Sequence, residues 1–194
     1  MNKLTIILAS IVGVFLIAQL LMSYKNKDIE TPKYKVVKTY DSFEIRQYDS
    51  MILAQTVIQE TSIKKSGNTG FRKVAGYIFG GNRNNQQIAM TAPVIMEVGD
   101  NTKMSFVMPS QYKMEDLPQP NSSEVKLVKA APKKFAVLTF SGFASDEKIN
   151  RKKELLKEAL KKEQISVKGD FSYLGYNAPW DLFGRRNEVA IEVE

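Results

Sequence analysis

The feature that most constrains the fold of this chain is a series of secondary-structure signals that occurs twice between residues 34 and 194. Each series has a strand, a helix, a segment with an Ala–Pro dipeptide and another strand. The segments are Met51–Val57, residues 68–79, Ile88–Val94 and Lys103–Met108, and then Lys134–Phe140, Ser145–Glu163, Tyr173–Trp180 and Asn187–Val193. We therefore predict an α+β fold of duplicated βαββ units, with a strongly curved antiparallel sheet or barrel and two helices against it.

The second predicted helix has the more complete signal. Ser145 is a favoured N-cap residue, and Asp146 and Glu147 follow it in the first turn, where the helix dipole favours anions. Lys161 and Lys162 lie at the other end, where the dipole favours cations. The stripe that we expect to face the core consists of Ile149, Leu156 and Leu160.

The first predicted helix contains a glycine, Gly76, in its interior, at a cost of about 1 kcal/mol relative to alanine. Such a glycine marks either the close approach of a ligand or a packing contact with another backbone. Gly80 and Gly81 are expected to end this helix through a left-handed C-cap. Its apolar side chains are Phe71, Val74, Ala75, Ile78 and Phe79.

Neither cysteine nor histidine occurs among the 194 residues. Disulfides, zinc–thiolate sites, iron–sulfur clusters and cysteine nucleophiles are therefore excluded. A Ser-His-Asp triad and the common His-bearing metal sites are excluded as well. The carboxylate pairs at 41 and 44 and at 115 and 116 lie in expected turns or exposed strands. We predict a non-enzymatic protein without catalytic or metal-ligating residues.

The net charge of +7 and the pI of about 9.4 favour acidic partners such as anionic lipid, nucleic acid or a ligand that carries carboxylates. The alternative is a solvated, lysine-rich surface without a specific partner. No nucleic-acid-binding module is recognisable in the sequence. We therefore predict no nucleic-acid partner.

Residues 1–23 form a segment of their own. Leu4–Met22 carries no charge and approaches the ~20 residues with which a helix spans a bilayer. A cleaved signal peptide is the alternative, although its apolar region would be shorter and would end in a small-x-small site. We predict an uncleaved single-pass transmembrane helix, a linker at residues 24–33, and an extracytoplasmic domain at residues 34–194.

Six motifs occur together in the predicted domain. They are Phe43–Tyr48, Phe71–Asn82, Ile88–Val94, Phe106–Ser110, Gly175–Trp180 and Gly184–Val189. In this order they resemble the SOUL heme-binding proteins, from about Tyr34 to Glu194. The resemblance implies a distorted antiparallel β-barrel of duplicated βαββ units flanked by two helices. It also implies binding of heme or another tetrapyrrole as a ligand, without turnover, in a shallow apolar cleft along the first helix.

The resemblance further implies which residues contact the ligand. Those on the first helix are Phe71, Val74, Tyr77 and Ile78, and those on the opposite wall are Ala178, Pro179 and Trp180. Aromatic side chains at such positions suit stacking on a macrocycle. The alternative for each of them is ordinary core packing.

The chain departs from the family pattern where heme would be held. It has no histidine to serve as an axial ligand, and Asn68 and Asp181 stand where some members have basic residues. Tyrosine or methionine would have to ligate the iron if anything does. The basic residues that could replace the missing ones beside heme propionates are Arg72, Lys73, Arg83 and Arg185.

Two other functions remain open from the residues alone. The missing histidine favours a different hydrophobic small-molecule effector in the same cleft. A protein-interaction module with an unused cleft is the third hypothesis. For the arginine pair at 185 and 186, we expect at least one structural ion pair with Glu188 or Glu44, because the guanidinium fork suits a carboxylate.

Overall fold

The computed structural model describes residues 2–3, 5, 7–8, 10–15, 29–59, 63–99 and 102–194. Its described strands form one nine-stranded antiparallel sheet with the order β1-β2-β7-β9-β8-β4-β5-β3-β6. The elements are β1 (Tyr34–Thr39), β2 (Glu44–Tyr48), β3 (Met51–Ile58), α2 (Ile63–Ile78), β4 (Val94–Glu97), β5 (Thr102–Val107), the 3-10 helix η2 (Met114–Asp116), β6 (Val125–Ala130), β7 (Lys133–Ser141), α3 (Asp146–Lys162), β8 (Val167–Gly175) and β9 (Arg186–Val193). The predicted α+β class is confirmed.

The predicted duplication is confirmed by the order of these elements. The series β3-α2-β4-β5 and β7-α3-β8-β9 are both βαββ units. In the sheet, β7-β9-β8 lies next to β4-β5-β3, so the two units are related about the β4–β8 pair. The strands that precede each unit are exchanged, because β2 pairs with β7 of the second unit and β6 pairs with β3 of the first.

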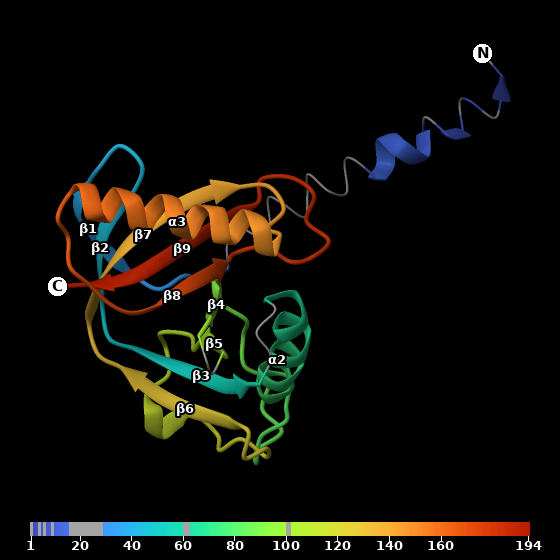
Figure 1. Ribbon diagram of the computed structural model, residues 1–194. Coiled ribbons are helices and arrows are strands. Elements are labelled where there is room, and N and C mark those ends of the chain that lie inside the picture. Colours follow the sequence, from blue (N-terminus) through green and yellow to red (C-terminus); the bar gives the residue numbers. More distant parts are fainter. Residues whose placement is uncertain are drawn as a thin grey trace.

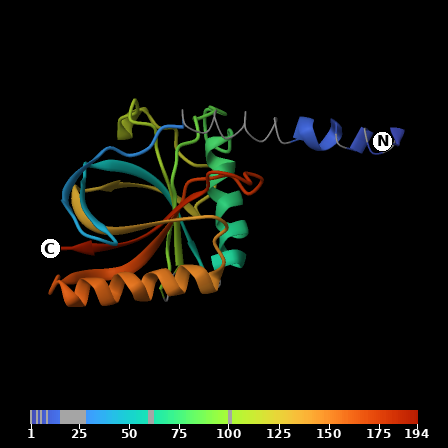
Figure 2. The same cartoon turned by 90° about the horizontal axis from the view of Figure 1, so that it is seen from above.

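One part of the argument for duplication was wrong. Ala92–Pro93 lies immediately before β4, whereas Ala178–Pro179 lies after β8, in the loop that leads to β9. The equivalent strands are β4 and β8, so the two dipeptides occupy different places in their units. The predicted barrel is also only partly correct. Strands β1 and β6 are the two ends of the strand order, and the sheet curls into a half-barrel without closing (Figure 2).

Both long helices cover the convex side of the curled sheet (Figures 1 and 2). Alternate residues of each strand point to this side. In the first unit Ala54, Met104 and Phe106 pack with α2, and in the second Val189 and Ile191 pack with α3. Each unit therefore has its own apolar layer between helix and sheet, while the other set of alternate residues faces the concave side.

The helix ends follow local chemistry. As predicted, the Ser145 hydroxyl caps α3 by accepting a hydrogen bond from the Lys148 N–H at 3.2 Å. Helix α2 ends in a Schellman motif, in which Gly80 has a φ of +106° and the Gly81 N–H donates to the Gly76 carbonyl at 2.8 Å. Helix α2 begins at Ile63, five residues before the predicted start.

The early start of α2 runs against the low helix propensity of its first residues, which include Gly67 and Gly70. Gly70 lies within the predicted range, and packing accounts for a glycine there, because an added Cβ would lie 2.3 Å from Ile58 Cδ1 and 3.1 Å from Met104 Cβ. The helix therefore approaches β3 more closely than any larger residue at this position would allow.

No helix in the described part of the chain is long and apolar enough to cross a membrane. Much of the predicted transmembrane segment Leu4–Met22 lies outside the described residues, as do the first residues of the predicted linker. The end of that linker contacts the domain, since the Glu30 carbonyl accepts a hydrogen bond from the Ala92 N–H at 2.9 Å.

Candidate functional site

The predicted ligand residues of α2 are mostly covered. Val74, Tyr77 and Ile78 belong to the core between α2 and the sheet, and each is at most 2% exposed. Phe71 is only partly buried, and its ring lies 5.3 Å from that of Phe106. The Tyr77 hydroxyl donates to the Pro118 carbonyl at 2.9 Å, and burial raises the pKa of Tyr77 to about 12. Of the four, Phe71 is therefore the most accessible to a ligand.

The predicted opposite wall lies in the loop between β8 and β9, at residues 176–185. Ala178 is half-buried, whereas Pro179 is exposed and Trp180 is 65% exposed. Figures 1 and 2 both place this loop near α2. The sequence prediction thus brings together a helix and a loop that are neighbours in the fold.

Polar contacts fix the shape of this loop. The Asp181 carboxylate accepts from the Ala178 N–H at 3.0 Å and from the Asn177 side-chain amide at 3.3 Å. Arg185 Nη1 donates to the carbonyls of Ala178 and Asp181, at 2.9 and 2.6 Å. Asp181 is 1% exposed, so its carboxylate stabilises the loop and does not present a charge to a ligand.

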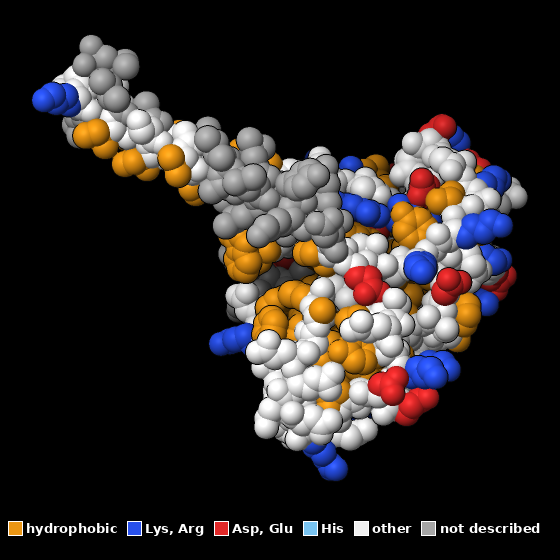
Figure 3. Space-filling model, turned by 180° about the vertical axis from the view of Figure 1, so that it is seen from behind, with side chains coloured by type: hydrophobic (Ala, Val, Ile, Leu, Met, Phe, Trp, Pro, Cys, Tyr) orange, Lys and Arg blue, Asp and Glu red, His pale blue; other side chains and the backbone are white. Residues whose placement is uncertain are grey.

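The loop holds a group of apolar side chains in solvent. Leu182 and Phe183 are exposed together with Trp180, and the Arg185 guanidinium lies 4.6 Å from the centre of the exposed Phe143 ring, which joins the group from the loop before α3. We call this group the loop patch; it consists of Pro179, Trp180, Leu182, Phe183 and Phe143. Figure 3 shows hydrophobic side chains exposed at several places on one face of the domain. Exposed aromatic groups of this kind mark binding surfaces more often than isolated apolar residues do.

The basic residues expected beside a propionate differ in the number of hydrogen bonds and ion pairs that they already form within the protein. Arg185 braces the loop, and Lys73 forms an ion pair with Glu124 at 2.6 Å. Arg72 is exposed and donates from Nε to the Asn68 carbonyl, which leaves its two terminal nitrogens without a partner among the described residues. Arg83 is exposed as well. Arg72 and Arg83 are therefore less engaged than Arg185 and Lys73.

A buried carboxylate, Glu188, ties four strands together on the concave side. Its Oε1 accepts from Arg46 of β2 at 3.0 Å, from Thr139 of β7 at 3.2 Å and from Arg186 of β9 at 2.7 Å. Its Oε2 accepts from the Tyr176 hydroxyl at 2.8 Å, just after β8. The ion pair expected for one arginine of the 185–186 pair is confirmed in Arg186.

The charges of this cluster determine its protonation. Burial alone would raise the pKa of Glu188, but Arg46 and Arg186 outweigh it and hold the pKa below its ordinary value. Burial also raises the pKa of Tyr176, and the neighbouring Glu188 charge raises it further. The cluster therefore consists of a carboxylate, two guanidinium groups and a protonated phenol near neutral pH, which suits a structural role.

The hollow of the half-barrel contains a cavity of about 470 Å³, which we call the concave cavity. Its apolar lining includes Leu53, Val128, Phe135, Leu174 and Ala190. The sequence reasoning did not find these residues. The available signal was that both sets of alternate residues in Met51–Ile58 are largely apolar, which indicates a strand covered on two faces.

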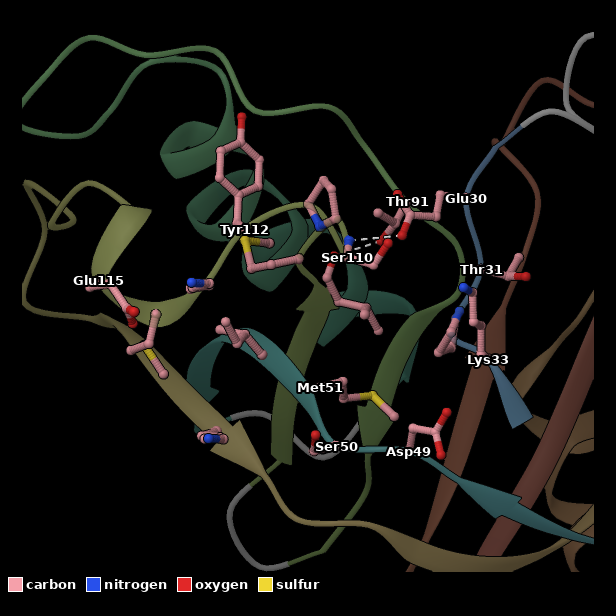
Figure 4. Close-up of a pocket in the computed structure, with 18 residues that line it drawn as sticks. Glu30, Thr31, Lys33, Asp49, Ser50, Met51, Thr91, Ser110, Tyr112 and Glu115 are labelled. Atoms are coloured by element: carbon pink, nitrogen blue, oxygen red, sulfur yellow. Dashed lines mark hydrogen bonds between the residues drawn. The ribbon is translucent and has the colours of Figure 1, made fainter. Parts of the chain in front are cut away.

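A second cavity, of about 460 Å³, adjoins the first and is called here the rim cavity (Figure 4). The Glu30 carboxylate forms part of its wall and accepts a hydrogen bond from the Ser110 N–H at 2.8 Å. The end of the predicted linker is thus part of a cavity wall. The residues that line both cavities are Pro32, Met51 and Lys129. None of the seven predicted ligand residues lines either of them.

The described residues contain no group of three or more Asp, Glu, His or Cys side chains that could hold a metal ion.

The duplicated βαββ units, with both helices on one side of a curled sheet and an apolar hollow on the other, define a class of small α+β domains. Solved structures share this fold. The C-terminal domain of EcmrR has a TM-score of 0.61 at 7% identity, covering 83% of this chain and 98% of that one. A hydrolase from Listeria innocua has a TM-score of 0.58 at 8% identity, covering 81% and 94%. These similarities concern the fold alone.

Within this class, the model of the SOUL heme-binding protein family matches residues 29–192, and the chain belongs to that family. It is similar to heme-binding protein 2 of Homo sapiens, with 31% identity over 175 residues that cover 83% of this chain and 84% of the relative. Heme-binding protein 2 of Mus musculus is 29% identical over 178 residues, covering 85% and 86%. The resemblance inferred from the six motifs is confirmed.

Proposed function

We propose that this protein binds heme or a related tetrapyrrole without enzymatic turnover, at the loop patch and the neighbouring side of α2. The observation that carries the proposal is membership of the SOUL heme-binding family over residues 29–192. The exposed Trp180 offers a ring on which a macrocycle can stack. Of the predicted residues, Phe71, Ala178, Pro179 and Trp180 contact the ligand, while Val74, Tyr77 and Ile78 support it from the core.

The binding proposed here depends on contact with the macrocycle and not on a strong iron ligand. The sequence has no histidine or cysteine. Tyr77 is a poor phenolate ligand, because its hydroxyl is bonded to Pro118 and its pKa is raised to about 12. The exposed guanidinium of Arg72 is the group proposed to pair with a propionate.

The experiment that tests this proposal compares hemin with metal-free protoporphyrin IX. Emission from Trp180, the only tryptophan, is followed as each compound is added to the full chain. We expect saturable quenching by both, with dissociation constants within about threefold of each other, because iron ligation contributes little without a histidine. If neither hemin nor protoporphyrin IX quenches the emission in a saturable way, the proposal is contradicted. Binding of hemin alone would show that an iron ligand, Tyr or Met, has been missed.

We also propose that the domain is held at a membrane by residues 1–23, as an extracytoplasmic domain. In support, the described apolar residues of this segment have exposed side chains, including Ile7, Ile11 and Phe15. Membrane fractionation of the full chain, followed by carbonate extraction and protease treatment of intact cells, tests this proposal. Recovery of the protein in the soluble fraction would contradict it.

A further inference from the structure

The concave face of the sheet has an apolar lining that no element among the described residues covers. Strands β2 to β9 all contribute to the concave cavity, through alternate residues such as Met51, Leu53 and Gln55 of β3. Leu53, Leu174 and Ala190 at its base are at most 9% exposed, and Val128 at its mouth is 38% exposed. Its volume of about 470 Å³ lies within the ~300–1,000 Å³ of small-molecule sites in proteins.

The charged residues around this cavity largely neutralise one another. Lys103 is paired with Glu97 at 3.4 Å, and Lys133 is paired with Glu192 at 2.6 Å. Lys168 also lines the cavity and is paired with Glu194 at 3.4 Å. Of the four lysines that line the cavity, only Lys129 forms no ion pair with the described residues. A ligand with two carboxylates would have to break at least one of the other pairs, whereas a neutral ligand would leave them in place.

One polar group in the lining has no protein partner in hydrogen-bond geometry. Tyr48 is 6% exposed, and its hydroxyl makes no such bond to the described residues, although it lies close enough to the Arg46 guanidinium for the two groups to shift each other's pKa. The Tyr48 ring lies between the rings of Phe135 and Tyr34, with distances between ring centres of 5.8 and 5.2 Å. A buried hydroxyl without a partner is unfavourable, so a ligand that hydrogen-bonds to it gains affinity at little cost.

From these three observations we infer that the concave cavity is a second binding site, for a compact, neutral and apolar small molecule with one hydrogen-bonding group near Tyr48. The site is separate from the loop patch, and it does not depend on tetrapyrrole binding there. None of the residues proposed to hold the tetrapyrrole lines this cavity.

The test uses N-phenyl-1-naphthylamine, a neutral apolar dye with one N–H group, whose emission increases in an apolar environment. The dye is titrated into the full chain and into two variants that fill the cavity. Val128→Phe adds bulk at the mouth, where exposure keeps the risk to folding low. Ala190→Leu adds bulk at the base. Because every variant keeps the N-terminal apolar segment, dye bound there contributes equally to all titrations.

We expect both variants to raise the dissociation constant of the dye by about tenfold or more, because the new side chains occupy volume that the dye needs. Val37→Phe is the matched control, since Val37 is exposed on β1 and does not line the cavity. It should bind the dye as the wild type does, and so should Trp180→Ala. Circular dichroism checks that each variant is folded.

Unchanged dye affinity in both filled variants would overturn the inference, and so would loss of dye binding in Trp180→Ala. Displacement of the dye by stoichiometric hemin would overturn the separation of the two sites. The outcome is independent of the proposed function, because failure of hemin to bind at Trp180 leaves the dye titration unaffected.

Discussion

At the scale of single residues, the Glu188 cluster is a buried polar network that joins four strands of the sheet. One fully buried carboxylate accepts hydrogen bonds from groups on or next to four strands of the sheet. Its pKa is lowered in the folded state, so its contribution to stability is present above its ordinary pKa of 4.5 and is lost as the pH falls through the lower folded value.

The substitution Glu188→Gln is expected to lower the free energy of unfolding at pH 7 by about 3 kcal/mol, because it leaves Arg46 buried with less compensating charge. Urea unfolding measures the change. Between pH 7 and pH 3 the wild type should lose stability more steeply than this variant. The control is Glu97→Gln, in a half-exposed pair with Lys103, which should change stability by no more than ~0.5 kcal/mol. Equal stability of wild type and Glu188→Gln would contradict the structural role.

Two buried tyrosine hydroxyls provide a second comparison. The Tyr48 hydroxyl has no partner in hydrogen-bond geometry among the described residues and only lies near the Arg46 guanidinium, whereas the Tyr77 hydroxyl donates to the Pro118 carbonyl. In thermal or urea unfolding without ligand, Tyr48→Phe should be neutral or stabilising by up to about 1 kcal/mol. Tyr77→Phe should be destabilising by about 1 kcal/mol, since it removes a buried hydrogen bond. If Tyr48→Phe destabilises the protein more than Tyr77→Phe does, the Tyr48 hydroxyl stabilises the folded state.

At the scale of elements, Gly70 and Gly76 of α2 have different roles. A Cβ on Gly70 would lie 2.3 Å from Ile58 Cδ1, but a Cβ on Gly76 would meet no atom within 4 Å. The packing explanation weighed for Gly76 therefore applies to Gly70, and the space beside Gly76 is open. Sequence reasoning noticed a glycine that broke the helix pattern, but it could not see which glycine faces a strand.

Alanine substitutions should separate the two glycines. Gly76→Ala is expected to raise the free energy of unfolding by ~0.5–1 kcal/mol through helix propensity. Gly70→Ala is expected to lower it despite the same gain, because Ile58 has to move away from the new methyl group. Urea unfolding of the two variants beside the wild type measures both changes. A stabilising Gly70→Ala would show that α2 is not held as close to β3 as described here.

Local sequence signals predicted the helices and strands of this chain better than they predicted which of these elements pack or pair with one another. The capping residue and apolar stripe of α3 gave its limits to within a residue, since those signals lie within the helix itself. The start of α2 was missed because its first residues, which include Gly67, have low helix propensity. The Ala–Pro pairs were misjudged as equivalent because a dipeptide carries no information about which strand it joins.

At the scale of the whole molecule, the duplicated units exchange their leading strands. Strand β2 pairs with β7 and β6 pairs with β3, so each unit is completed by a strand of the other. No local pattern predicts this exchange, because it depends on long-range pairing. The same curl creates the concave cavity from eight strands, which explains why residue motifs located the loop patch but not the cavity.

The structure also changes how the proposed binding site should be probed. Tyr77 and Val74 belong to the core, so their replacement by alanine would unfold α2 and remove any ligand site indirectly. Trp180 is 65% exposed on a loop held by Asp181 and Arg185, so its replacement tests ligand contact without disturbing the fold.

The most direct test of the central claim is a hemin titration of the full chain, followed through the Soret band, with the wild type compared to Trp180→Ala. Val167→Ala, at an exposed residue of β8, is the matched control. We expect a saturable, shifted Soret band at one hemin per chain for the wild type and the control, and affinity about tenfold weaker for Trp180→Ala through loss of stacking. A saturable band of equal affinity in all three proteins, or a featureless response in the wild type, would contradict heme binding at the loop patch.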